Sequence, residues 1–228
     1  TYLNEFHANN GGQMVDFAGW EMPVNYGSQI SEHKEVRENV GIFDVSHMAV
    51  FDFEGSRQVE FLKHLLPNDV NKILDSTRAL YSPLLNDEGM ILDDLIVYHL
   101  GDENFRIISN CGTRDQNNAW FTKIALNFDV ALDFKEEASI IALQGPKAKQ
   151  YLSEMFDVDL DPFHIQTLDD VMIARTGYTG EVGFEIISNA SRGLELWDHF
   201  IEKGIKPVGL AARDTLRLEA GFNLYGSD

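Results

Sequence analysis

The sequence has a single cysteine, Cys111, so neither an intrachain disulfide nor a cysteine zinc cluster can form. Its seven histidines show no H-E-x-x-H motif and no close pairs, and we therefore expect no metal site. The patterns G-x-x-x-x-G-K-[ST] and G-x-S-x-G are absent as well. Their absence excludes P-loop nucleotide hydrolases and serine hydrolases with a nucleophile elbow.

Basic residues are also scarce, with 18 Lys and Arg against 37 Asp and Glu and a net charge of −19. This balance argues against non-specific binding of nucleic acid or of anionic membranes. The stretch Thr1–Asn10 lacks the basic and apolar regions of a signal peptide, and no apolar run approaches the ~20 residues of a membrane span. These absences predict a soluble intracellular protein.

Material for packing is plentiful. Hydrophobic residues make up 44% of the 228 residues, which is sufficient for one or two cores. Predicted helices and strands mix without regular βαβ alternation, and this mixture indicates an α+β fold with antiparallel sheets flanked by helices. We predict helices at 28–40, 57–66, 114–126, 146–156, 191–203 and 213–220, and strands at 48–54, 78–85, 90–100, 105–109, 130–134, 138–143, 171–176 and 184–188.

The first predicted helix begins at Ser28, a typical N-cap residue, and ends at Gly41. Its periodicity predicts one buried face formed by Ile30, His33, Val36 and Val40.

Asp93 and Asp94 are adjacent charges in an otherwise apolar predicted strand. Neighbouring side chains of a strand point to opposite faces, so the two carboxylates should not face each other. We expect one to reach solvent or a cavity and the buried one to have a partner such as arginine. An alternative is that these charges protect an exposed edge strand from aggregation.

A glycine-rich segment runs from Arg175 to Glu181, and with Gly183, which follows it, three glycines (Gly177, Gly180 and Gly183) fall within seven residues. Glycine leaves room above the backbone, so the segment predicts a tight connection that a flat ligand can approach. Tyr178 and Glu185 would flank that approach. The alternative is an ordinary glycine-rich hairpin with a tyrosine at its tip.

Five motifs occur in order along the chain: Gly41-Ile-Phe-Asp-Val-Ser-His-Met48, Ile91-Leu-Asp-Asp-Leu-Ile-Val97, Ala142-Leu-Gln-Gly-Pro146, Arg175-Thr-Gly-Tyr-Thr-Gly-Glu181 and Gly209-Leu-Ala-Ala-Arg-Asp-Thr-Leu-Arg-Leu-Glu-Ala-Gly221. Together they resemble the aminomethyltransferase (T-protein) family of the glycine cleavage system. The resemblance implies a discontinuous first domain, residues 1–47 plus 138–228, with a second α+β domain inserted at 48–137. The family's C-terminal β-rich domain would lie outside this sequence.

The same resemblance implies a transferase of one-carbon metabolism that takes part in glycine catabolism. It would move the one-carbon unit from the aminomethyl-lipoyl arm of H-protein to tetrahydrofolate and release ammonia. Tetrahydrofolate would be the co-substrate, without a metal, and lipoylated H-protein the partner. We expect a monomer in the bacterial cytoplasm, or in the mitochondrial matrix of a eukaryote.

Site residues are carried over position by position. The resemblance implies that Asp94 is the catalytic residue, near N10 of tetrahydrofolate. It also implies that Arg213 lies near the folate, whereas we assign Arg217 to an ion pair with Asp214 or Glu219. We expect His47 to be structural. The remaining implied folate contacts are Met48 and Tyr81 as apolar walls, Asn110 as a polar contact for the pterin, Glu185 as an acceptor of hydrogen bonds from the pterin ring, and Tyr178 as a tyrosine in contact with the ligand.

Two other functions remain open at this point. One is a different folate-dependent methyltransferase or demethylase of the same superfamily, and the other is a folate-binding module without catalysis. An aspartate at position 94 fits aminomethyl transfer, whereas the resemblance implies that the other groups often differ there.

Overall fold

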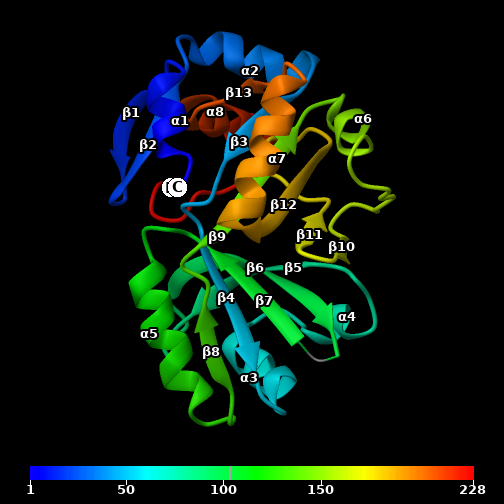
Figure 1. Cartoon of the computed structure of the whole chain (residues 1–228). Coiled ribbons are helices and arrows are strands. Elements are labelled where there is room, and N and C mark those ends of the chain that lie inside the picture. The colour runs from blue at the N-terminus through cyan, green and yellow to red at the C-terminus, as the bar shows by residue number, and fades with distance from the viewer. Residues whose placement is uncertain (103) are drawn as a thin grey trace. The chain divides into compact units, whose positions relative to one another are not determined.

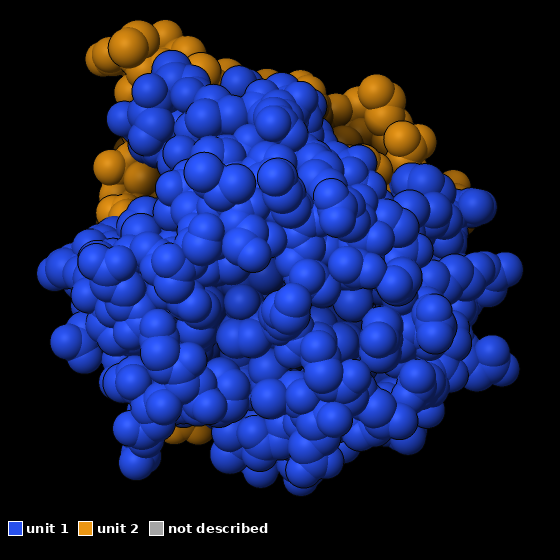
Figure 2. All heavy atoms as spheres, turned by 90° about the horizontal axis from the view of Figure 1, so that it is seen from above, with its two compact units in different colours: residues 1–47, 138–162, 166–228 blue, residues 48–137, 163–165 orange. Residues whose placement is uncertain are grey.

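The computed structural model describes residues 1–102 and 104–228. It divides into two compact units, shown in two colours in Figure 2. Unit 1 comprises Thr1–His47, Ala138–Pro162 and Gln166–Asp228, and unit 2 comprises Met48–Glu137 with Phe163–Ile165. Each unit has its own main sheet and its own hydrophobic core. The predicted α+β class with antiparallel sheets and helices is confirmed.

The main sheet of unit 1 has six strands in the order β10-β11-β12-β9-β3-β13 (Figure 1). Strands β11, β12, β9 and β3 pair antiparallel in turn, and β13 runs parallel to β3. A separate two-stranded sheet pairs β1 with β2. The strands are β1 (Gln13–Phe17), β2 (Trp20–Asn25), β3 (Gly41–Asp44), β9 (Ala138–Gln144), β10 (Ile165–Leu168), β11 (Val171–Ala174), β12 (Gly183–Asn189) and β13 (Lys206–Pro207).

Helices α6 and α7 pack on one face of this sheet, where alternate residues of the central strands enter the core. Ile141 and Leu143 of β9 meet Trp197 and Phe200 of α7 in the same cluster. The neighbouring residues of β9 and β12 therefore point to the opposite face. The helices of unit 1 are α1 (Asn4–Asn9), α2 (Gln29–Glu38), α6 (Ala148–Leu152), α7 (Ala190–Glu202) and α8 (Leu210–Ala220).

The predicted buried face of helix α2 is confirmed at Val36 and at Val40, which follows the helix, and it is wrong at Ile30. Ser28 caps the helix as expected by accepting a hydrogen bond from the Ser31 amide, but Ile30 is 70% exposed. Glu32 is buried instead, because its carboxylate accepts the backbone N–H groups of Tyr26 at 2.7 Å and Gly209 at 2.8 Å. The second of these hydrogen bonds ties α2 to the N-terminus of α8, which has no side-chain cap of its own.

Unit 2 is built on a five-stranded antiparallel sheet in the order β5-β6-β7-β4-β8 (Figure 1). The strands are β4 (Ala49–Glu54), β5 (Leu80–Leu85), β6 (Ile91–Gly101), β7 (Asn104–Ser109) and β8 (Ala131–Phe134), and the helices are α3 (Gln58–Leu65), α4 (Asn71–Leu74) and α5 (Arg114–Ala125).

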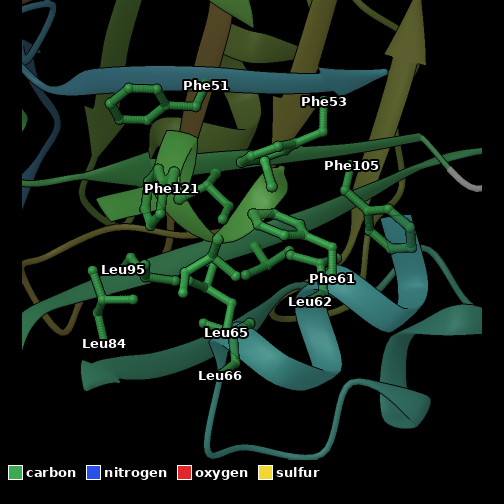
Figure 3. Packing of buried hydrophobic residues seen from close by; sticks show 14 of the residues in the cluster. Phe51, Phe53, Phe61, Leu62, Leu65, Leu66, Leu84, Leu95, Phe105 and Phe121 are labelled. Atoms are coloured by element: carbon green, nitrogen blue, oxygen red, sulfur yellow. The ribbon is translucent and has the colours of Figure 1, made fainter. Parts of the chain in front are cut away.

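Aromatic rings fill the core between this sheet and helices α3 and α5 (Figure 3). Phe51 and Phe53 of β4 are buried on one face of their strand, which was predicted at 48–54. Phe51 meets the ring of Phe121 edge-on with centroids 5.2 Å apart, and Phe53 lies 5.1 Å from Phe61. Such contacts between aromatic rings add to the stabilisation that burial of the rings provides.

Several elements in the described residues were not predicted: α1, α4, β1, β2, β3, β10 and β13. All are six residues long or shorter, and a window of that length carries little periodicity. Helix α6 is also shorter than predicted, because it ends at Leu152 and residues 153–155 form turns. Within the described residues, no helix combines the length and apolarity needed to cross a bilayer.

Replacing Phe121 by alanine should destabilise unit 2. The ring is fully buried, so Phe121→Ala should lower the free energy of unfolding by about 3–5 kcal/mol. The matched control is Leu126→Ala at the end of the same helix, where the side chain is 82% exposed and the expected change is within about 0.5 kcal/mol. Urea denaturation followed by circular dichroism would measure both, and equal effects would contradict the assignment of the core.

Candidate functional site

Asp93 and Asp94 lie on β6, an inner strand that pairs with β5 on one side and β7 on the other. The alternative of a charge that protects a sheet edge is therefore wrong for these residues. Asp93 is fully buried and Asp94 is half-buried, as expected for neighbours on opposite faces of a strand.

Asp93 is held by neutral donors, and the expectation of an arginine partner was wrong. Its carboxylate accepts hydrogen bonds from the Asn110 amide at 2.7 Å, the Thr113 hydroxyl at 2.6 Å and the Asn117 amide at 2.5 Å. Hydrogen bonds to the charged form offset the cost of burying a carboxylate without a cation. Thr113 and Asn117 come from the start of α5, and no sequence motif identified them.

The carboxylate of Asp94 is fixed by two donors, one of which it shares with Asp93. The Tyr81 hydroxyl donates to Oδ2 at 2.7 Å, and the Asn110 amide donates to Oδ1 at 2.7 Å. Asn110 therefore joins both carboxylates, although they leave opposite faces of the strand. Tyr81 was expected to be an apolar wall, but it acts as a hydrogen-bond donor. Met48, the remaining expected contact in unit 2, is half-buried directly before β4.

Glu185 lies on β12 in unit 1, on the face opposite to the α7 core. Its cross-strand neighbours are Ala174 and Ala142, so it stands between two small side chains. Burial raises the pKa of the Glu185 carboxyl above its ordinary value. A hydrogen bond from Thr176 and the positive charge of Arg213 act in the opposite direction on that pKa.

The glycine-rich segment lies on a buried side chain rather than below an open space. A β-carbon at Gly177 or at Gly183 would collide with the side-chain amide of Gln144, a residue that is 1% exposed. This amide donates to the Thr176 carbonyl at 3.2 Å and accepts the Thr179 hydroxyl at 2.8 Å. The expected room for a flat ligand above these two glycines is therefore filled by Gln144.

Arg213 and Tyr178 form a stack in unit 1. The guanidinium carbon of Arg213, on α8, lies 4.2 Å from the centroid of the Tyr178 ring. Tyr178 is also stacked on Phe222 at 5.8 Å between centroids, and its hydroxyl donates to the Asn223 carbonyl. A cation over an aromatic face is an attractive arrangement that orients both groups.

Arg217 and His47 are two further residues of unit 1 for which the sequence predicts a role other than ligand contact. Arg217 donates to Asp214 at 2.9 Å, so its predicted helical ion pair is confirmed. His47 is 2% exposed, and burial followed by the positive charge of Arg213 lowers its pKa to about 4, so it is neutral at pH 7.

The seven expected site residues thus fall in both units. In unit 2 the structure brings together Tyr81, Asp94 and Asn110, and in unit 1 it brings Arg213 onto Tyr178 and within electrostatic range of Glu185. Among residues 1–102 and 104–228, no cluster of His, Cys, Asp and Glu side chains suits a metal ion.

A family model described as the GCVT N-terminal domain matches residues 3–228. The chain belongs to this family. The resemblance inferred from the five motifs is therefore confirmed at the level of the family.

Curated members of the GCVT family show close similarity over the whole chain. The aminomethyltransferase of Francisella tularensis subsp. tularensis is 49% identical over 235 residues, and that of Francisella philomiragia subsp. philomiragia is 48% identical. Each alignment covers 100% of this chain and 65% of the relative. The chain thus spans 65% of the length of these relatives.

Solved structures agree with this assignment. The glycine cleavage system aminomethyltransferase T from Bartonella henselae matches with a TM-score of 0.95 and 37% identity, over 100% of this chain and 64% of that one. A chain of the heterotetrameric sarcosine oxidase from Corynebacterium sp. U-96 matches with a TM-score of 0.53 and 14% identity, over 82% of this chain and 92% of that one. The second likeness concerns the fold alone.

The raised pKa of Glu185 predicts a pH-dependent contribution to stability. The folded chain binds this proton more tightly than the unfolded chain, where the pKa of glutamate is about 4.3. Its contribution is therefore most favourable below the unfolded pKa and is lost as the pH rises through the folded pKa. The melting temperature of Glu185→Gln minus that of the wild type should therefore increase as the pH is raised from 4 to 7.

Thermal unfolding of both proteins across that range measures the difference. Glu195→Gln is the matched control, because Glu195 is an exposed glutamate of α7 in the same unit. A difference between wild type and Glu185→Gln that stays constant with pH would contradict the assigned shift.

Proposed function

We propose that this chain carries out aminomethyl transfer to tetrahydrofolate, with H-protein as the donor of the aminomethyl-lipoyl group. The observation that supports this most directly is the carboxylate of Asp94, held between the Tyr81 hydroxyl and the Asn110 amide in a member of the GCVT family. Ammonia would be the leaving group. The bacterial relatives favour the cytoplasm of a bacterium as the location.

The reaction needs a fixed negative charge. Transfer of the one-carbon unit develops positive character at the methylene carbon and at the attacking nitrogen of tetrahydrofolate. A carboxylate a few ångströms away stabilises that charge, and it does so most effectively when its own orientation does not change during the reaction. We infer that Tyr81 and Asn110 provide this orientation by each engaging one oxygen of Asp94.

We infer that the unit 1 residues recognise the folate itself. The two oxygens of Glu185 suit the N–H and NH2 edge of a pterin ring, and the raised pKa of this carboxyl indicates a poorly hydrated environment. Arg213 and Tyr178 provide a cation and a ring on the same unit. We keep Met48 as an apolar contact. No metal is required for these roles.

Replacement of Asp94 tests the catalytic role. Asp94→Asn keeps an acceptor for the Tyr81 hydroxyl but removes the charge, so the rate of methylenetetrahydrofolate formation should fall by about 100-fold or more. Binding of tetrahydrofolate should change little. The control is Asp87→Asn, whose side chain is 75% exposed in the turn between β5 and β6. An unchanged turnover in Asp94→Asn, assayed with aminomethylated H-protein, would disprove this role.

Replacement of Glu185 tests folate recognition. Loss of a hydrogen bond to a charged group should weaken binding by more than ~1 kcal/mol, so Glu185→Ala should raise the dissociation constant for tetrahydrofolate about fivefold or more. Calorimetry measures this directly, with Glu195→Ala as the exposed control on the same unit. Equal affinities of the two variants would argue against a pterin contact at Glu185.

A further inference from the structure

Arg37 on α2 links two segments that are far away in sequence. One terminal nitrogen, Nη1, donates to the Thr179 carbonyl at 2.7 Å and to Glu181 at 2.9 Å, both in the glycine-rich segment. The other, Nη2, donates to Glu219 at 2.9 Å and to the Leu216 carbonyl at 3.5 Å, both on α8. The guanidinium therefore faces the segment with one nitrogen and the helix with the other.

The two linked segments carry the two members of the unit 1 stack. Tyr178 directly precedes Thr179, and Arg213 lies about one helical turn before Leu216. The distance of 4.2 Å between the Arg213 guanidinium and the Tyr178 ring therefore depends on how the glycine-rich segment sits on α8.

The packing at this junction is tight. Gly180 has a φ of +80°, and a β-carbon placed there would lie 2.9 Å from the β-carbon of Ala220 on α8. The same position is 3.9 Å from Nη1 of Arg37. The segment and the helix thus approach each other at Gly180, and Arg37 provides the hydrogen bonds that hold them at this separation.

We propose that Arg37 is a positioning residue that sets the Arg213 guanidinium over the Tyr178 ring. It acts by placing Arg213, which binds the folate together with Tyr178 under the proposed function, and this inference rests on that function. The planar guanidinium can reach four acceptors on two segments, whereas a lysine ammonium at the end of a flexible chain cannot reproduce this geometry. Arg37 therefore contributes to affinity for tetrahydrofolate without contacting it.

The test compares Arg37→Ala and Arg37→Lys with Arg192→Ala. Arg192 is the matched control because it also forms ion pairs with two acidic side chains, Asp170 and Glu195, and its exposure of 28% is close to the 25% of Arg37. Arg37→Ala should weaken tetrahydrofolate binding about fivefold or more in calorimetry, Arg37→Lys by less, and Arg192→Ala by less than about twofold. Melting temperatures of all three verify that the variants fold.

A double replacement separates positioning from general stability. If Arg37 acts through Arg213, then Arg37→Ala should change the affinity of an Arg213→Ala protein by less than about twofold. An equal loss in both backgrounds overturns the proposal. Wild-type affinity in Arg37→Ala alone also overturns it.

A measurement without ligand keeps this inference distinct from the proposed function. Protons of the Arg213 side chain should show an upfield ring-current shift from Tyr178 in nuclear magnetic resonance spectra. The shift should disappear in Arg37→Ala and persist in Arg192→Ala. If the shift persists in Arg37→Ala, positioning is disproved. If wild-type protein does not bind tetrahydrofolate, the proposed function fails while the shift still decides the role of Arg37.

Discussion

The buried amide of Gln144 is the contact on which the arrangement of unit 1 depends. It occupies the volume that side chains at Gly177 and Gly183 would need, and it bonds both Thr176 and Thr179. One side chain thereby sets how closely the glycine-rich segment lies on the sheet. A buried amide left unpaired would cost free energy, so the segment gains little by moving away. The position of Tyr178 follows from this constraint.

In unit 2 the buried carboxylate of Asp93 plays a role comparable to that of the Gln144 amide in unit 1. Asp93 takes hydrogen bonds from three donors, and one of these donors, Asn110, also bonds Asp94. In each unit a fully buried polar side chain fixes groups next to an expected site residue: Thr176 and Thr179 near Tyr178 in unit 1, and Asn110 beside Asp94 in unit 2. Such networks are stabilising when their members are paired, and they hold the outer group in one rotamer.

Arg213 is a cation in a chain whose net charge is strongly negative, and its charge changes the pKa values of two neighbouring groups in unit 1. His47 is neutral at pH 7 because burial and the charge of Arg213 lower its pKa, so it does not add a second cation beside Arg213. Glu185 feels the same arginine, which partly offsets the effect of its burial. The cation of Arg213 is thus placed among groups whose protonation it influences.

Local sequence determined much of this protein. Alternation predicted that Asp93 and Asp94 leave opposite faces, glycine spacing predicted a tight connection near Tyr178, and five ordered motifs identified the family. Only the tertiary structure decided which aspartate is buried, that Gln144 fills the space at the glycines, and that Glu32 rather than Ile30 is buried on α2. The reason is that these outcomes depend on partners 17 to 177 residues apart, as in the Asn110–Asp93 and Gly209–Glu32 hydrogen bonds, and periodicity in a short window carries no information about them.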